Sequence, residues 1–221
     1  TKALRGDSKV QGDWGEMILE RILERSGLRK GEEYFVQETL RDEAGKLITT
    51  EDNRGGLRPD VIVRYPNSGA MVIDSKVSLT AYSRYLSADT EEVRAMALRE
   101  HLQSIRKHID ELSRKKYEEH VSGAANFVML FIPNEPAYSL ALTHESNLWE
   151  EAYAKNVVLI NGTNLIAALR MAQDMWQRER QERNIQRIVE ESTKLYDKFA
   201  TFAETFLEVG KKLQSASLAF D

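Results

Sequence analysis

The segment from 58 to 79, RPDVIVRYPNSGAMVIDSKVSL, constrains the fold of this chain more than any other. Two short apolar runs lie on either side of the turn-forming residues PNSG (66–69), a pattern that predicts a β-hairpin. Asp60 stands at the start of the first run and Asp74 at the end of the second. Because an unpaired charge beside a core is costly, both carboxylates need a partner, which is either structural or catalytic.

The remaining pattern alternates helical and extended segments. Strands are predicted at 33–40, 125–133 and 156–162, a polar loop or loose hairpin at 41–56, and helices near the N-terminus and at 91–117, 135–154 and from Thr163 almost to the end. The helix at 91–117 carries one apolar stripe, made of Leu98, Leu102, Ile105, Ile109 and Leu112. Alternation of this kind indicates an α/β fold, a sheet with helices on its faces.

The C-terminal helix is too long to be covered by such a domain. Its apolar residues recur three and four apart, as in a coiled-coil seam, at Ile185, Ile188, Leu195, Phe199, Phe202, Phe206, Val209 and Leu213. The polar Ser192 occupies one seam position of this heptad pattern. We therefore predict a domain at 1–176 and a helical, coiled-coil-like extension at 177–221. The segment 185–215 is expected to pair with another copy or a flanking coiled coil, and the alternative is that it packs back on its own sheet domain.

The composition limits the possible functions. With 221 residues, 42% of them hydrophobic, the chain can bury a sizeable core, and the lack of cysteine excludes disulfides, thiolate metal sites and thiol catalysis. A net charge of −4 argues against a generally basic nucleic-acid surface. No run is apolar enough for a membrane helix or a signal peptide, so we expect no membrane contact by this chain and a cytoplasmic location. The four histidines (101, 108, 120 and 144) lack metal-binding spacing and are expected at the surface.

The hairpin brings charged residues together. With the turn centred between Asn67 and Ser68, Asp60 falls opposite Ser75 to within one residue, so Asp60 and Asp74 lie side by side. Period-two alternation places Asp74 and Lys76 on one face of their strand. Adjacent carboxylates repel each other, and Mg²⁺ commonly reconciles them, while a nearby ammonium can hold or deprotonate a water molecule. The alternative is a salt bridge between Asp74 and Lys76 at a strand end, with Asp60 as an ordinary cap.

The order of these segments also resembles a known family. A Pro-Asp strand, an Asp-Ser-Lys strand and a preceding helix with a glutamate resemble the PD-(D/E)xK nuclease superfamily. Four stretches resemble the RmuC family in order and spacing over roughly residues 10 to 180: GDWGEMILERILERSGL, RPDVIVRYP…VIDSKVSLTAY, FVMLFIPNEPAYSLAL and VVLINGTNLIAALRMAQDMW. One departure is the NGTN stretch at 161–164, where the family tends to have a Thr-Pro-Thr-Thr-like sequence.

The resemblance implies a restriction-endonuclease-like mixed sheet and a role in DNA recombination. It also implies that this chain, which begins at Thr1, is the catalytic fragment of a longer protein whose relatives carry an N-terminal membrane helix and a coiled coil. The implied site is a Mg²⁺ ion, for which Mn²⁺ can substitute, held by Asp60, Asp74, the carbonyl of Ser75 and Glu16, with Glu20 as the alternative to Glu16. Lys76 would activate water.

Contacts to DNA are expected from four further residues: Arg54, Arg58, Gln37 and Asn164. The functional hypotheses are three. The first is a Mg²⁺-dependent deoxyribonuclease, the second a DNA-binding or scaffolding module without turnover, and the third a coiled-coil interaction protein whose sheet domain is only a cap. Two intact carboxylates beside a lysine favour the first, since a binding module does not need them together. The net acidity favours the other two.

Overall fold

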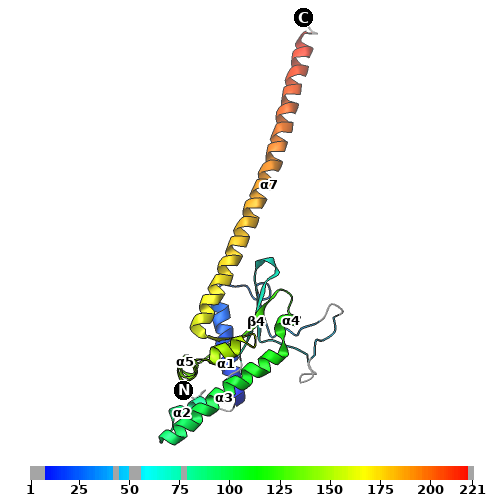
Figure 1. The fold of residues 1–221 in the computed structure, drawn as a ribbon. Coiled ribbons are helices and arrows are strands. Elements are labelled where there is room, and N and C mark those ends of the chain that lie inside the picture. The colour runs from blue at the N-terminus through cyan, green and yellow to red at the C-terminus, as the bar shows by residue number, and fades with distance from the viewer. Residues whose placement is uncertain (1–7, 42–44, 50–55, 76–78, 219–221) are drawn as a thin grey trace. The chain divides into compact units, whose positions relative to one another are not determined.

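The computed structural model describes residues 8–41, 45–49, 56–75 and 79–218 (Figure 1). The helices are α1 (Ser8–Arg25), α2 (Thr80–Leu86), α3 (Glu91–Lys115), α4 (Tyr117–His120), α5 (Glu135–His144), α6 (Leu148–Tyr153) and α7 (Gly162–Leu218). The strands are β1 (Tyr34–Val36), β2 (Val61–Arg64), β3 (Ala70–Asp74), β4 (Ala124–Ile132) and β5 (Val157–Asn161). By its contacts the chain divides into Thr1–Met175 and Trp176–Asp221. The predicted division into a domain at 1–176 and a coiled-coil-like extension at 177–221 stays a prediction.

The strands form one mixed sheet in the order β1-β2-β3-β4-β5. The first three strands pair antiparallel, whereas β3 with β4 and β4 with β5 pair parallel. Parallel neighbours need helical crossovers, and α2, α3 and α4 supply the first of them, α5 and α6 the second. The predicted class, a mixed α/β sheet flanked by helices and followed by a long C-terminal helix, is confirmed.

Strands β2 and β3 are buried along almost their whole length, and β1, β4 and β5 are buried in part. Alternate strand residues such as Ile62, Val72 and Leu130 belong to the main core, which also contains Ile105 and Ile109 of α3. Intervening residues such as Val61, Val63 and Ile73 are equally buried but lie outside that core. Outside that core also lie buried leucines of α1 and of the first turns of α7, namely Leu19, Leu23, Leu165 and Leu169. We assign these two helices to the opposite face.

Three of the predicted segments end early or divide in the structure. The strand predicted at 33–40 ends at Val36, because Gln37 has a positive φ of 51° that no strand continues through. The helix predicted at 91–117 ends at Lys115, because Lys116 adopts the left-handed conformation. The helix predicted at 135–154 is two helices, α5 and α6.

The hairpin register is close to the predicted one. Asn67 and Ser68 supply the positive φ angles of the turn, at 62° and 65°. Val61 pairs with Ile73, so continuing the ladder by one residue sets Asp60 opposite Asp74 instead of Ser75, within the predicted margin of one. Directly opposed residues of an antiparallel pair share a face of the sheet.

The expectation that all four histidines lie at the surface is wrong for His101. This side chain is 0% exposed and packs against the ring of Tyr82, with 5.8 Å between ring centroids. Its Nε2 lies 3.0 Å from the carbonyl oxygen of Ala137, so Nε2 carries the proton, because a carbonyl only accepts. The Nδ1 atom is buried without a hydrogen-bond partner among the described residues. Burial lowers the pKa of His101, and the bond to Ala137 opposes this shift only in part.

This burial predicts a loss of stability in mild acid. Below about pH 6.5, the ordinary pKa of histidine, the unfolded chain binds a proton that buried His101 does not, so the free energy of unfolding falls as the pH falls. Thermal melts between pH 7.5 and 5 should show this fall, and His101→Leu should reduce its slope. The exposed His144, changed to leucine, is the control and should keep the slope. An equal slope in His101→Leu would contradict the assignment.

The part of α7 beyond Trp176 exposes large apolar side chains. Phe199, Phe202 and Phe206 stack along it, with ring centroids 6.4 and 6.0 Å apart, and each is more than 60% exposed. A continuous stripe of exposed phenylalanines is typical of interaction surfaces. Within the described ranges, no helix has the length and apolar character needed to cross a membrane.

We predict that residues 185–215 associate with another copy or with a flanking coiled coil. Burying the stripe would remove a large apolar area from water, which drives association. Light scattering at several concentrations should then show a concentration-dependent oligomer for the full chain, and a folded monomer for a chain cut after Arg183. A full chain that is monomeric at all concentrations, together with a cut chain that unfolds, would contradict the prediction.

Candidate metal and DNA site

The two hairpin aspartates have different environments. Asp74 is 2% exposed, and its Oδ1 accepts a hydrogen bond from Lys115 Nζ at 3.1 Å. Asp60 is half-buried, and its Oδ2 accepts from the backbone nitrogen of Ser75 at 2.7 Å. The second bond ties the start of β2 to the end of β3, so the carboxylate of Asp60 lies at the residue next to Asp74.

Tyr117 connects the same two strand ends. Its buried hydroxyl accepts from Lys115 Nζ at 3.2 Å and donates to the carbonyl oxygen of Arg58 at 3.1 Å. Burial raises the pKa of Tyr117, and the negative charges of Asp74 and Asp60 raise it further. Both carboxylates therefore act on one hydroxyl.

No sequence pattern marks Lys115 or Tyr117 as part of the site. A lysine at a helix C-terminus is ordinary, since it complements the helix dipole, and Tyr117 was placed in the same helix. The break at Lys116, whose φ is 45° and ψ 47°, turns the chain between them. The lysine ammonium also lies 5.1 Å from the centroid of the tyrosine ring. No local pattern signals this break.

Glu16 lies on α1 and faces the first strand. Gln37 Nε2 donates to Glu16 Oε2 at 2.8 Å, and Arg58 Nε donates to the carbonyl oxygen of Gln37 at 2.9 Å. The guanidinium of Arg58 also donates to Oε1 of Gln37. Glu16, Gln37 and Asp60 line one cavity of about 290 Å³. The structure thus brings together four of the predicted site residues: Glu16, Gln37, Arg58 and Asp60.

The alternative helix residue, Glu20, lines the same cavity but has another partner. Its Oε1 accepts from Lys30 Nζ at 2.8 Å, and both side chains are about half exposed. Glu16 instead bonds to Gln37, which bonds in turn through its backbone nitrogen to the carbonyl oxygen of Asp60. This chain of contacts favours Glu16 as the residue of α1 that belongs with the aspartates.

Gly15 lets α1 approach the end of β3. A Cβ atom at this position would stand 3.0 Å from Oγ of Ser75 and 3.4 Å from Cγ of Pro133, closer than most side chains tolerate. The neighbouring residue is Glu16, so the absence of a side chain at Gly15 is part of how α1 presents that carboxylate near the strand ends.

The donor atoms suit a hard divalent cation. Mg²⁺ prefers carboxylate and carbonyl oxygens, which Glu16, Asp60, Asp74 and Ser75 provide. Of these carboxylates, Glu16 and Asp60 line one cavity. Asp60 and Asp74 are opposed across the hairpin. Over the described ranges, no three His, Asp or Glu side chains come close enough together to hold one ion. Lys76 and Arg54 lie outside the described residues, so their predicted roles stay predictions.

The stretch at 161–164 has a structural role in starting α7. Asn161 is buried, and its Oδ1 accepts from the backbone nitrogen of Asn164 at 2.9 Å, as a helix N-cap does. Its Nδ2 donates to Glu135 Oε1 at 2.6 Å. The side chain of Asn164 is exposed, and its predicted contact with DNA stays a prediction.

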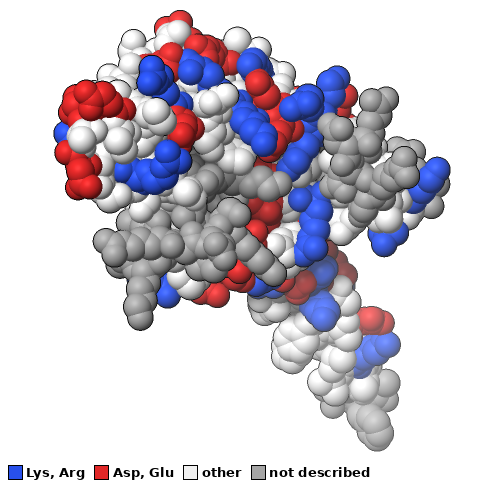
Figure 2. All heavy atoms as spheres, turned by 90° about the horizontal axis from the view of Figure 1, so that it is seen from below, with Lys and Arg blue, Asp and Glu red and all other residues white. Residues whose placement is uncertain are grey.

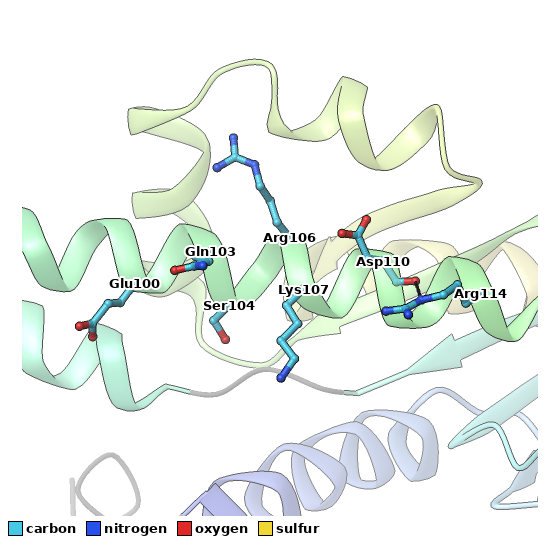
Figure 3. Close-up of a pocket in the computed structure, with 7 residues that line it drawn as sticks. All are labelled: Glu100, Gln103, Ser104, Arg106, Lys107, Asp110 and Arg114. Carbon is cyan, nitrogen blue, oxygen red and sulfur yellow. Dashed lines mark hydrogen bonds between the residues drawn. The ribbon is translucent and has the colours of Figure 1, made fainter. Parts of the chain in front are cut away.

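A second hollow, of about 480 Å³, runs along α3 (Figure 3). It is lined by Glu100, Gln103, Ser104, Arg106, Lys107, Asp110 and Arg114. Arg106 points away from Lys107 in Figure 3 and forms ion pairs with Glu151, at 3.0 Å, and with Glu145. Hydrogen bonds from Arg106 lower the pKa of Glu151, and Asp110 pairs with Lys155. The ion pairs of Arg106 therefore neutralise one basic charge of this helix, and the pair with Lys155 neutralises one acidic charge.

The face of the molecule shown in Figure 2 carries mixed charge. Figure 2 shows Lys and Arg side chains in bands with Asp and Glu side chains beside them. This mixture agrees with 31 basic and 35 acidic residues in the chain. A contact with a polyanion would therefore depend on a few cations near the site, such as Arg58, more than on a broad basic surface.

The fold and site define a class: a mixed α/β protein with acidic residues gathered at the ends of a β-hairpin. Comparison with known proteins gives the family. The RmuC family model matches residues 1–221, and the chain belongs to the RmuC family. This confirms the resemblance of its motifs to that family.

Relatives with curated names agree. The DNA recombination protein RmuC homolog of Pseudomonas aeruginosa is 42% identical over 222 residues, which cover 100% of this chain and 47% of that protein. The homolog of Vibrio cholerae is 42% identical, with 100% and 41% covered. The DNA recombination protein RmuC of Escherichia coli K12 is 42% identical over 218 residues, with 98% and 44% covered. The chain thus spans less than half the length of these relatives. No solved structure gave a significant match.

Proposed function

We propose that this chain is the catalytic part of a metal-dependent deoxyribonuclease of the PD-(D/E)xK kind that acts in DNA recombination. The observation that carries the proposal is the hairpin register, which opposes Asp60 and Asp74 at neighbouring strand ends. Glu16, which shares a cavity with Asp60, supports it. The role in recombination follows from the names of the relatives.

The residues have distinct parts in the proposed reaction. Glu16, Asp60, Asp74 and the carbonyl of Ser75 would hold Mg²⁺ or Mn²⁺. Such a cation polarises a phosphodiester and lowers the pKa of a water molecule. Lys76 would hold or accept the proton of the attacking water, since it follows Asp74 by two residues in the sequence.

Arg58 is the described cation best placed to bind a phosphate of the DNA. Its side chain is exposed, and its bonds to Gln37 fix the guanidinium next to the cavity that holds Glu16 and Asp60. A guanidinium held in place loses little conformational entropy when it binds an anion, and its planar donors match phosphate oxygens.

A second candidate function is a DNA-binding or scaffolding module without turnover. One observation favours it: each of the three carboxylates already accepts a hydrogen bond from a protein donor, Lys115, Ser75 or Gln37. A module that uses the acids only to hold its strands together would show the same contacts. The two functions differ in whether DNA is cut.

The test is incubation of the chain with labelled single-stranded, duplex and branched DNA in Mg²⁺, Mn²⁺ or EDTA. The nuclease should cut at least one form in either metal and none in EDTA, and Asp60→Asn should remove the cutting. Binding of DNA without cutting of any form, in either metal, would establish the scaffolding function instead.

A further inference from the structure

We propose that Lys115 is a positioning residue for this site, which holds the carboxylate of Asp74 and, through Tyr117, the segment from Arg58 to Asp60. The inference rests on the proposed nuclease function. It concerns a residue 41 positions from Asp74, on a helix that the sequence motifs do not include.

The first step is the burial of Asp74. A carboxylate that is 2% exposed cannot be oriented by water, so its direction depends on its protein partners. Lys115 Nζ bonds to Oδ1 at 3.1 Å, while 21% of the lysine side chain remains exposed. The ammonium thus reaches the buried carboxylate from the edge of the site and engages one of its two oxygens.

The second step is the link to the other aspartate. Lys115 Nζ also donates to the hydroxyl of Tyr117, which donates to the carbonyl oxygen of Arg58, two residues before Asp60. Three consecutive contacts therefore join the end of β3 to the residues that lead into β2. A shift of Lys115 would move the two acids relative to each other.

The third step separates this role from plain stabilisation. A buried ion pair is weak evidence of stability, because desolvation offsets much of its attraction. Partners that orient metal ligands, in contrast, are known to change metal affinity or activity by about 10- to 100-fold when they are replaced. Lys115 contacts one proposed ligand directly and reaches the segment of the other through Tyr117, as such a partner does.

The experiment compares Lys115→Met, Lys115→Arg and Tyr117→Phe with the parent chain. The control is Lys155→Met, which removes an exposed Lys–Asp pair between Lys155 and Asp110. For each variant we would measure the cleavage rate against Mg²⁺ concentration on the DNA that the parent cuts. Binding of MnCl₂ without DNA, followed by electron paramagnetic resonance, gives a readout independent of cleavage.

We expect Lys115→Met to lower kcat by about 10- to 100-fold, to raise the Mg²⁺ concentration needed for half-maximal rate, and to weaken Mn²⁺ binding. Lys115→Arg should recover part of the rate, Tyr117→Phe should show a smaller loss in the same direction, and Lys155→Met should match the parent. A merely structural lysine would lower the melting temperature and the active fraction, with the Mg²⁺ dependence unchanged.

Two further results would overturn the inference. Tighter Mn²⁺ binding in Lys115→Met would mean that the ammonium only competes with the cation. Parental rates and metal dependence in both Lys115→Met and Tyr117→Phe would mean that the contacts do not matter. If Lys115→Met fails to fold, Tyr117→Phe and Lys115→Arg decide by the same measurements. A parent that neither cuts DNA nor binds Mn²⁺ would instead overturn the proposed function. The two results above would overturn only the role of Lys115 and would leave the proposed function standing.

Discussion

Replacing Lys76 by alanine is expected to lower the rate of DNA cleavage by about 100-fold or more, the loss typical of a positioned proton-transfer group. DNA binding and folding should change little, because the proposed role of the ammonium is on water and not on the DNA backbone. Single-turnover cleavage in Mg²⁺, together with a binding isotherm in EDTA, separates the two effects.

The matched control is Lys155→Ala, a change of the same kind at an exposed position paired with Asp110. It should leave both rate and binding at parental values. Unchanged turnover in Lys76→Ala would remove Lys76 from the mechanism. A similar loss in DNA binding would show that the ammonium contacts the substrate instead.

Gly123→Ala is expected to destabilise the fold by about 2–4 kcal/mol, among the larger effects of a single substitution. Gly123 has a φ of +73°, and a Cβ atom there would stand 1.6 Å from the carbonyl oxygen of Ser68. That carbonyl belongs to the hairpin turn, and the carbonyl of Gly123 accepts a bond from Ala70 at the start of β3. The backbone must shift to make room, and both strands of the hairpin would shift with it.

Urea unfolding at equilibrium measures this change. Gly12→Ala in α1 is the control, because a Cβ there has nothing within 4 Å and alanine favours a helix. The control should be neutral or slightly stabilising. A loss below about 1 kcal/mol in Gly123→Ala would mean that the turn adapts at little cost, since an unstrained site responds this weakly.

Part of the candidate site follows from local sequence. The turn residues at 66–69 and the alternating apolar runs beside them determine a hairpin, and its two-residue period places Asp60 and Asp74 side by side. Glu16, with Glu20 as its alternative, came only from the resemblance of the motifs to the family. The hairpin features depend on neighbours within a few residues or on one short turn, so a sequence pattern specifies them.

The remaining features depend on contacts between distant segments. Lys115 meets Asp74 across 41 residues, and Tyr117 meets Arg58 across 59. The burial of His101 under α5 likewise depends on how α3 packs. Each of these residues has an ordinary local pattern, because a charged, aromatic or imidazole side chain on a helix is compatible with either surface or core.

The sequence by itself determined the class of fold, the hairpin with its two acids, and the seam of the C-terminal helix, all through hydrophobic periodicity and turn chemistry. Only the tertiary structure decided what those acids contact. The left-handed Lys116 ends α3 at the height of the strand ends, and Gln37 ends β1 with a positive φ. Such backbone conformations are unfavourable for residues with a side chain and persist only where the surrounding packing enforces them. A local sequence pattern therefore does not predict them.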